Sequence, residues 1–208
     1  MRYLVFFVVI AMILFSCEEN ERLPFLGHAD IDYSTNDTVY PKIPEFEYLN
    51  QDSILIKSGD MKGKIWIADF FFTTCPTICP VMTTQMKRLN GMTEDLSEHI
   101  QFMSFSIAPK HDQPSQLMRY IDHHGIKANN WHFFTGDESA THLLGVESFL
   151  VHAAADEEAP GGYAHSGAFT LVDKEGYVRG VYMGTETEEV NRLEKDLRIL
   201  LKDEYGIE

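Results

Sequence analysis

Two cysteines separated by three residues are the strongest chemical signal in the chain. Cys75 and Cys79 lie in the segment Cys-Pro-Thr-Ile-Cys-Pro, between a run typical of a buried strand and a run with helical spacing. Residues four apart on a helical turn share one face, so the two thiolates could hold a single ion or form a disulfide. The N–H groups at a helix N-terminus favour negative charge and lower the thiol pKa. Spacing alone leaves a metal site, a redox pair and an inert buried pair open.

The other residues available as ligands narrow the choice of metal. Thiolates prefer Cu(I), zinc or the iron of iron–sulfur clusters. The chain has 3 cysteines in all, too few for a cluster or for a closed structural zinc site with only sulfur ligands. Among 9 histidines, His165 differs because it begins a predicted strand just after an acidic, glycine-bearing loop at 156–162. One or two histidines could complete a copper site.

Two methionines near the cysteines favour packing over ligation. Met82 and Met86 lie on the cysteine-bearing face of the predicted helix. Thioethers fill irregular gaps well, and helical spacing is typical of core residues. We therefore expect both side chains in the core.

The elements that must position these residues alternate between strands and helices. The run 65–72 is short and nearly all apolar, which predicts a central buried strand. The alternation predicts an α/β fold, a central mixed sheet with helices on both faces. This is the order of a thioredoxin-like fold, although periodicity alone does not separate it from other mixed sheets. The predicted strands are 43–49, 54–57, 65–72, 101–107, 131–134, 165–172 and 177–183, and the predicted helices are 80–96, 114–124, 138–150 and 186–201.

The N-terminus resembles an export signal. Arg2 precedes an apolar run from Tyr3 to Phe15 that fits a signal-peptide core and is short for a membrane span. The run ends in Leu-Phe-Ser-Cys, similar to the cleavage box of bacterial lipoproteins, in which Cys17 would carry the lipid; an ordinary signal peptide with an incidental cysteine is the alternative. We expect a lipoprotein signal peptide at 1–16, a lipidated N-terminus and tether at 17–40, and one thioredoxin-like copper-binding domain at 41–208. The protein would then be lipid-anchored in a bacterial cell envelope, on the extracytoplasmic side.

Charge excludes one class of partner. The formal net charge is −15 at pH 7, which repels phosphate backbones, so we expect no nucleic-acid partner. The acidity suits a cation or a basic protein surface, and it could equally serve only to keep the domain soluble.

Three motifs in matching order resemble the Sco/SenC family. They are the cysteine segment 71–80, the tryptophan segment 131–136 and the histidine strand 165–173, and the resemblance covers about 41–201. It implies a thioredoxin-like fold and one copper ion, Cu(I) or Cu(II), held by Cys75, Cys79 and His165. It also implies delivery of copper to the binuclear centre of a respiratory cytochrome oxidase, or reduction of that centre's cysteines. The partner would be the copper-centre subunit of the oxidase or another copper protein.

One segment departs from the family pattern. The family usually has an aspartate and an arginine where this chain has Ala108 and His111, which leaves any role of those positions open. Asp112 is retained, and we expect it to cap the following helix.

A redox enzyme is the alternative function. A thiol–disulfide oxidoreductase or peroxidase could use the same fold, but such enzymes favour two residues between the cysteines, and disulfide exchange does not need His165. A binding module with an inert disulfide would also leave His165 unexplained. The resemblance therefore favours a metal-binding assembly factor over an enzyme.

Overall fold

The computed structural model describes residues 22–156 and 158–207. The predicted signal peptide and Cys17 lie outside these residues. Within them, no helix is long and apolar enough to cross a membrane. The strands are β1 Asp30–Asp32, β2 Asp37–Val39, β3 Glu47–Asn50, β4 Leu55–Lys57, β5 Ile65–Phe71, β6 Ile100–Ser106, β7 Trp131–Thr135, β8 Ala153–Ala155, β9 Tyr163–His165, β10 Ala168–Val172 and β11 Val178–Met183. The helices are η1 Ser58–Met61, α2 Cys79–Met92, η2 Glu94–Leu96, α3 Pro114–His124, α4 Glu138–Leu143, η3 Leu144–Ser148, α5 Thr187–Ile199 and η4 Leu200–Glu204.

A seven-stranded mixed sheet forms the centre of the fold. Its order is β11-β10-β5-β6-β7-β3-β4. Strands β5, β6 and β7 run parallel, and β10 joins β5 in the antiparallel direction. Every residue of β5 is buried, which confirms the predicted central strand. The hairpin of β10 and β11 is also confirmed.

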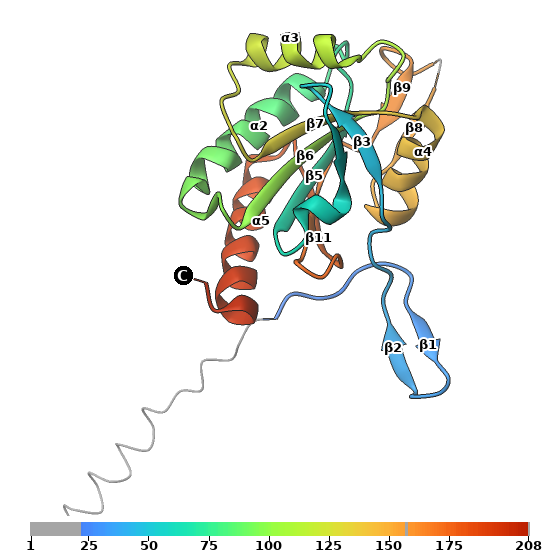
Figure 1. Cartoon of the computed structure of the whole chain (residues 1–208), viewed down its shortest axis with the longest axis vertical. Helices are drawn as coiled ribbons and strands as arrows, with labels where there is room; N and C mark the ends of the chain where they lie inside the picture. The colour runs from blue at the N-terminus through green and yellow to red at the C-terminus, as the bar shows by residue number, and fades with distance from the viewer. Residues whose placement is uncertain (1–21, 157, 208) are drawn as a thin grey trace, which may run out of the picture.

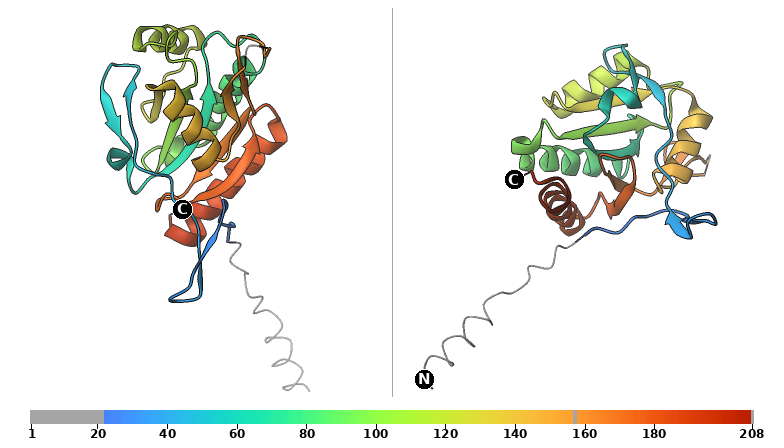
Figure 2. Two further views of the ribbon diagram at one scale, coloured as in Figure 1. Left: turned by 90° about the vertical axis from the view of Figure 1, so that its right-hand side faces the viewer. Right: turned by 60° about the horizontal axis from the view of Figure 1, so that its bottom comes forward.

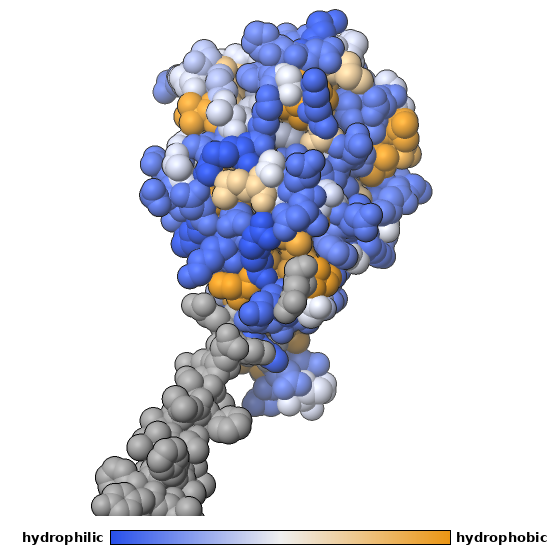
Figure 3. All heavy atoms as spheres, turned by 90° about the vertical axis from the view of Figure 1, so that its left-hand side faces the viewer, coloured by the Kyte–Doolittle hydropathy of each residue, from blue (hydrophilic) through white to orange (hydrophobic). Residues whose placement is uncertain are grey.

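Helices cover both faces of this sheet, as expected (Figures 1 and 2). On one face α2 packs between α3 and α5: Thr83 bonds Tyr120 of α3, and Arg88 bonds Asn191 of α5. On the other face, the π-helical turn η3 after α4 brings Gly145 against Phe70 of β5. Successive residues of β5 thus face different helices, because side chains alternate across a strand. The side carrying α2 and α5 presents a mostly hydrophilic surface (Figure 3).

The predicted strand 165–172 is wrong as one continuous element. It is divided into β9 and β10 at Ser166 and Gly167, where Gly167 has a φ of 71°. That left-handed backbone conformation suits glycine and ends the extended run. Strand β9 pairs with β8 in a separate two-stranded sheet. His165 therefore ends a strand of this β8–β9 hairpin, and it does not begin a strand of the central sheet.

Two predicted helices end earlier than expected. The helix expected at 80–96 is α2, which ends at Met92 and is followed by the separate 3-10 turn η2. The helix expected at 138–150 becomes a π-helical turn from Leu144 onward. Both changes lie at helix ends, where alternative hydrogen-bonding patterns are common.

The described part of the expected tether is structured. Strands β1 and β2 form a hairpin within 30–39, and the Leu26 N–H donates to the Val178 carbonyl of β11 at 2.8 Å. Leu23 and Leu26 pack against the domain core. Residues 22–40 are therefore not free chain, although the division at residue 40 stays a prediction.

Candidate metal centre

The two cysteines lie where the central strand passes into helix α2. Cys79 is the first residue of α2, whereas Cys75 lies in the turn between β5 and that helix. The expectation that both share one helical turn is therefore wrong. Both residues are nonetheless buried, at 7% and 1% exposure, and both are free thiols. The turn, rather than the helix, brings Cys75 over the helix N-terminus.

His165 completes a three-residue cluster with these thiols. Its Nε2 lies 3.4 Å from Cys79 Sγ and 3.8 Å from Cys75 Sγ. One ligand atom from each of the three residues lies within 4.8 Å of the other two. In the described part of the chain, no other group of three histidine, cysteine or acidic residues is arranged to hold a metal. Residues far apart in sequence thus converge on one point.

The two thiols share their protons unequally. The pKa of Cys75 is lowered, chiefly by its hydrogen bond with Cys79 and further by the bond with His165. The pKa of Cys79 is raised by the same bond and then by burial. The pair therefore favours a thiolate at Cys75 and a neutral thiol at Cys79. A metal ion bound by both sulfurs would displace the second proton, because a ligating cysteine is deprotonated.

Packing against Phe72 and the contacts of Nε2 with the two sulfurs orient the His165 ring. The ring lies edge-on to Phe72, with centroids 5.8 Å apart. Its buried Nδ1 has no hydrogen-bond partner among the described residues, whereas metal-ligating histidines usually donate that second N–H to an acceptor. The Nε2 atom is the one that faces both sulfurs, so the arrangement fits a metal ligated through Nε2.

A buried carboxylate holds the loop that precedes Cys75. Asp112 is fully buried and accepts a bond from the Thr73 backbone N–H at 2.9 Å and another from the Thr73 hydroxyl at 2.5 Å. Ser106 of β6 donates to the same carboxylate at 2.7 Å, and His111 Nδ1 lies 2.9 Å from it. The predicted capping role is wrong: Gln113 is the residue before α3, and that N-terminus has no side-chain cap. Asp112 instead ties the end of β5 to the end of β6.

Loss of this carboxylate should destabilise the domain. In Asp112→Ala, the donors of Thr73 and Ser106 lose their acceptor in a buried place. Each such group costs about 1–3 kcal/mol, so we expect a loss of about 3 kcal/mol or more in the free energy of unfolding, measured by urea titration. Asp122→Ala is the matched control, since Asp122 is exposed on α3. Equal stability of Asp112→Ala and the control would contradict this role.

A second acidic residue near the site was not singled out by the sequence analysis. Asp69 of β5 is 3% exposed and accepts a hydrogen bond from Ser104 at 2.5 Å. Burial raises its pKa to about 7, and its charge is among the causes that raise the pKa of Cys79. The sequence did contain a signal for this residue, which is an acid within an otherwise apolar central strand. A buried carboxyl must be hydrogen-bonded or carry a proton.

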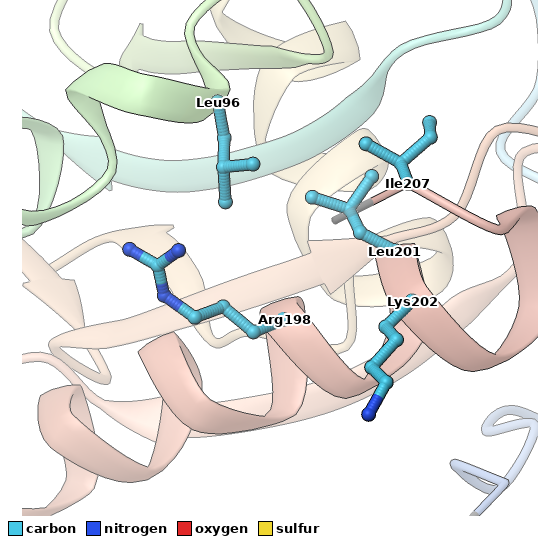
Figure 4. A pocket seen from close by; sticks show the side chains of 5 residues that line it. All are labelled: Leu96, Arg198, Leu201, Lys202 and Ile207. Atoms are coloured by element: carbon cyan, nitrogen blue, oxygen red, sulfur yellow. The ribbon is translucent and has the colours of Figure 1, made fainter.

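One pocket lies on another part of the molecule. It measures about 310 Å³ and is lined by Leu96, Arg198, Leu201, Lys202 and Ile207 near the C-terminus (Figure 4). Arg198 already pairs with Asp95 and Glu194. Cys75, Cys79 and His165 do not line this pocket.

The fold and the buried cysteine–histidine cluster together define a thioredoxin-like protein with a site for a soft metal. The SCO1/SenC family model matches residues 35–201. The SCO1 protein homolog of Bacillus subtilis is 30% identical over 158 residues, which cover 76% of this chain and 81% of that protein. The chain therefore belongs to the SCO1/SenC family.

Solved structures agree with this assignment. A SCO1/SenC family lipoprotein from Bacillus anthracis has a TM-score of 0.69 at 31% identity, covering 76% of this chain and 93% of that one. BsSco, a Sco protein with a disulfide switch from the family of cytochrome c oxidase assembly proteins, has a TM-score of 0.64 at 30% identity, covering 74% and 92%. ScoI of Arabidopsis thaliana, solved with copper bound, shares the fold at 19% identity with a TM-score of 0.62, covering 76% and 99%. The thioredoxin-like fold expected from the sequence is confirmed.

Proposed function

We propose that this protein binds one copper ion through Cys75, Cys79 and His165 and acts as an assembly factor for a respiratory cytochrome oxidase. It would deliver copper to the binuclear copper centre, or reduce that centre's cysteines before loading. The observation that carries the proposal is the convergence of two thiols and one imidazole within 4.8 Å. Its partner would be the copper-centre subunit of the oxidase or another copper protein.

The donor set suits copper in both oxidation states. Two thiolates satisfy Cu(I), which prefers soft ligands, whereas the imidazole adds a nitrogen that suits Cu(II). A closed structural metal site, such as that of zinc, has four protein ligands. With three protein ligands, this site would leave one coordination position open. An ion held in this way can pass to a partner that offers a further ligand.

A thiol–disulfide oxidoreductase is the second candidate, and one observation favours it. The pKa of Cys75 is lowered by its hydrogen bond with Cys79, and a thiolate is the form that attacks a disulfide. Reduction of a client's cysteines would use the same residue. The two activities differ in their need for His165, which disulfide exchange does not require.

The test of the function follows copper and thiols together. Cys75 and Cys79 are the proposed ligands and also the two thiols able to form an internal disulfide. A disulfide sulfur carries no thiolate charge, so the oxidised protein should bind almost no copper and regain one equivalent after reduction. The measurement is copper per protein against free-thiol count across a redox titration. Copper that stays bound as the thiol count falls to zero would place the ligands elsewhere.

The lipid anchor has its own test. We propose that Cys17 carries lipid and holds the domain on the extracytoplasmic side of a bacterial membrane, in keeping with the Bacillus anthracis lipoprotein. Cys17→Ser should release the mature domain to the soluble fraction or leave the chain uncleaved, and copper per protein should not change. The measurement is fractionation with intact-mass analysis. Wild-type maturation and fractionation of Cys17→Ser would contradict the anchor.

A further inference from the structure

A buried arginine fixes the N-terminal segment to the domain. Arg179 of β11 is 2% exposed. Its Nε donates to the Pro24 carbonyl at 3.1 Å, and one terminal nitrogen donates to the Leu23 carbonyl at 2.5 Å. The same guanidinium donates to Asp173 at 3.0 Å and to both carboxylate oxygens of Glu204 at 2.8 and 2.6 Å. An arginine has five N–H groups, and these five bonds engage all of them.

The N-terminal segment is a necessary part of this cluster. If residues 23 and 24 left, Arg179 would exchange two charge-assisted hydrogen bonds for bonds to water, a net loss of about 1.5–3 kcal/mol for each. Aromatic contacts add to the attachment: the guanidinium lies 4.2 Å from the centroid of the Phe25 ring, and that ring packs against Tyr177. We call this set of contacts the Arg179 clamp.

The clamp and the metal centre lie at opposite ends of the central sheet. Val178, which accepts the Leu26 N–H, is opposite Val172, and Val172 is opposite Trp66 near the start of β5. The cysteines follow the other end of β5. In Figure 1 the described chain begins at the bottom, beside the end of α5, whereas β9 lies at the top. The chain from the proposed lipid therefore reaches the domain at the end remote from the cluster.

The length of chain between the lipid and the clamp limits how far the domain can rotate relative to the membrane. Residues 18–22 separate Cys17 from the clamp and span at most about 20 Å when extended. A domain of this size is about 40 Å across, so an inverted domain would require a longer chain. Without the clamp, and with the β1–β2 hairpin intact, residues 18–29 and 40–42 could span about 50 Å, which exceeds the width of the domain and is enough for inversion. The clamp therefore converts a long tether into a short one.

We propose that the Arg179 clamp holds the lipid-anchored protein with its metal centre facing away from the bilayer. A partner would then approach from the aqueous side, and its copper-accepting residues would stand clear of the membrane surface. The inference rests on the proposed lipid anchor at Cys17. The advantage of this orientation for a partner rests on the proposed copper function. The orientation itself needs no copper.

Energy transfer to the membrane tests the orientation. The lipidated full chain would carry Cys75→Ser and Cys79→Ser, so that a dye reacts only with Lys62→Cys or Lys110→Cys. Both lysine side chains are exposed, at 70% and 85%; Lys62 precedes β5, and Lys110 follows β6 at the opposite end of the sheet. With acceptor-labelled phosphatidylcholine vesicles, position 62 should transfer more strongly than position 110. Equal transfer at the two positions, or stronger transfer at 110, would overturn the proposal.

Two substitutions and one insertion separate the effect of the clamp from other causes of orientation. Arg179→Lys keeps the charge but not the five-donor fork, and Phe25→Ala removes the exposed ring of the clamp without touching the core. Each should speed hydrogen exchange of the Leu26 amide and reduce the difference between the two dye positions. A flexible insert of twenty residues between 21 and 22 should abolish that difference while the Leu26 amide stays protected. A difference unaffected by both the insert and Arg179→Lys would overturn the role of the clamp, as would a lipidated protein that does not bind vesicles.

The dye-labelled protein carries serine in place of both Cys75 and Cys79. Its orientation on the vesicle therefore does not depend on metal binding. A protein that fails to bind copper in the redox titration could still show the predicted orientation. A protein that binds copper normally could equally show no preferred orientation. The two proposals therefore fail separately.

Discussion

Replacement of Cys75 or Cys79 by alanine is expected to abolish tight copper binding. Each substitution removes one of the two soft ligands, and the remaining sulfur and imidazole cannot make the two-sulfur coordination that Cu(I) prefers. Both side chains are buried, so a water ligand has little access to take the missing place. The measurement is competition with a Cu(I) chelator of known affinity. Tight binding that survives in either variant would contradict the assignment of the two thiolates.

His165→Ala should show a different pattern from the cysteine variants. Two thiolates alone can hold Cu(I), whereas Cu(II) benefits more from the nitrogen ligand, so Cu(II) binding should weaken more than Cu(I) binding. His152→Ala is the matched control, because His152 is exposed just before β8 in the same hairpin. Unchanged Cu(II) absorption in His165→Ala, as in the control, would remove His165 from the site.

The cysteine part of the site could be predicted because its signal is local. The apolar run before Cys75 and the helical spacing after Cys79 place the pair at a strand–helix junction on the basis of periodicity alone. The core role of Met82 and Met86 followed in the same way, and both are buried at 1% and 0% exposure. The spacing of apolar residues indicates which side chains are buried. These predictions therefore needed no knowledge of contacts between residues far apart in the sequence.

The histidine hairpin and the Asp112 network depend on contacts that periodicity does not record. The position of His165 near the cysteines came from the order of strands and the family resemblance. Its pairing with Ala153 in β8 is a contact between two short strands, and the break at Gly167 separates them from the central sheet. Asp112 lies one residue before the N-cap position of α3, so its sequence position resembles that of a capping residue. Only the tertiary approach of Thr73, 39 residues earlier, shows that its carboxylate faces inward.

Replacement of Asp69 by asparagine should change how stability depends on pH. Burial raises the pKa of Asp69 from 3.8 to about 7. The folded state therefore keeps a proton that the unfolded state loses, and this group contributes stability that is full below pH 3.8 and falls as pH rises through 7. Each pH unit in that window corresponds to about 1.4 kcal/mol. Between pH 5 and 7 the wild type should lose about 2 kcal/mol from this source, because the slope halves as pH reaches the folded pKa.

Asparagine keeps an acceptor for Ser104 but has no proton to lose. Ser104 also accepts a hydrogen bond from the Trp131 indole at 2.9 Å, so its hydroxyl is directed toward position 69 in both proteins. The urea midpoint of Asp69→Asn should therefore fall less between pH 5 and 7 than that of the wild type. Asp122→Asn, at an exposed position on α3, should retain the full wild-type dependence. The wild type and Asp69→Asn share every other titratable group, so their comparison isolates Asp69. Parallel curves for these two proteins would contradict the raised pKa of its carboxyl.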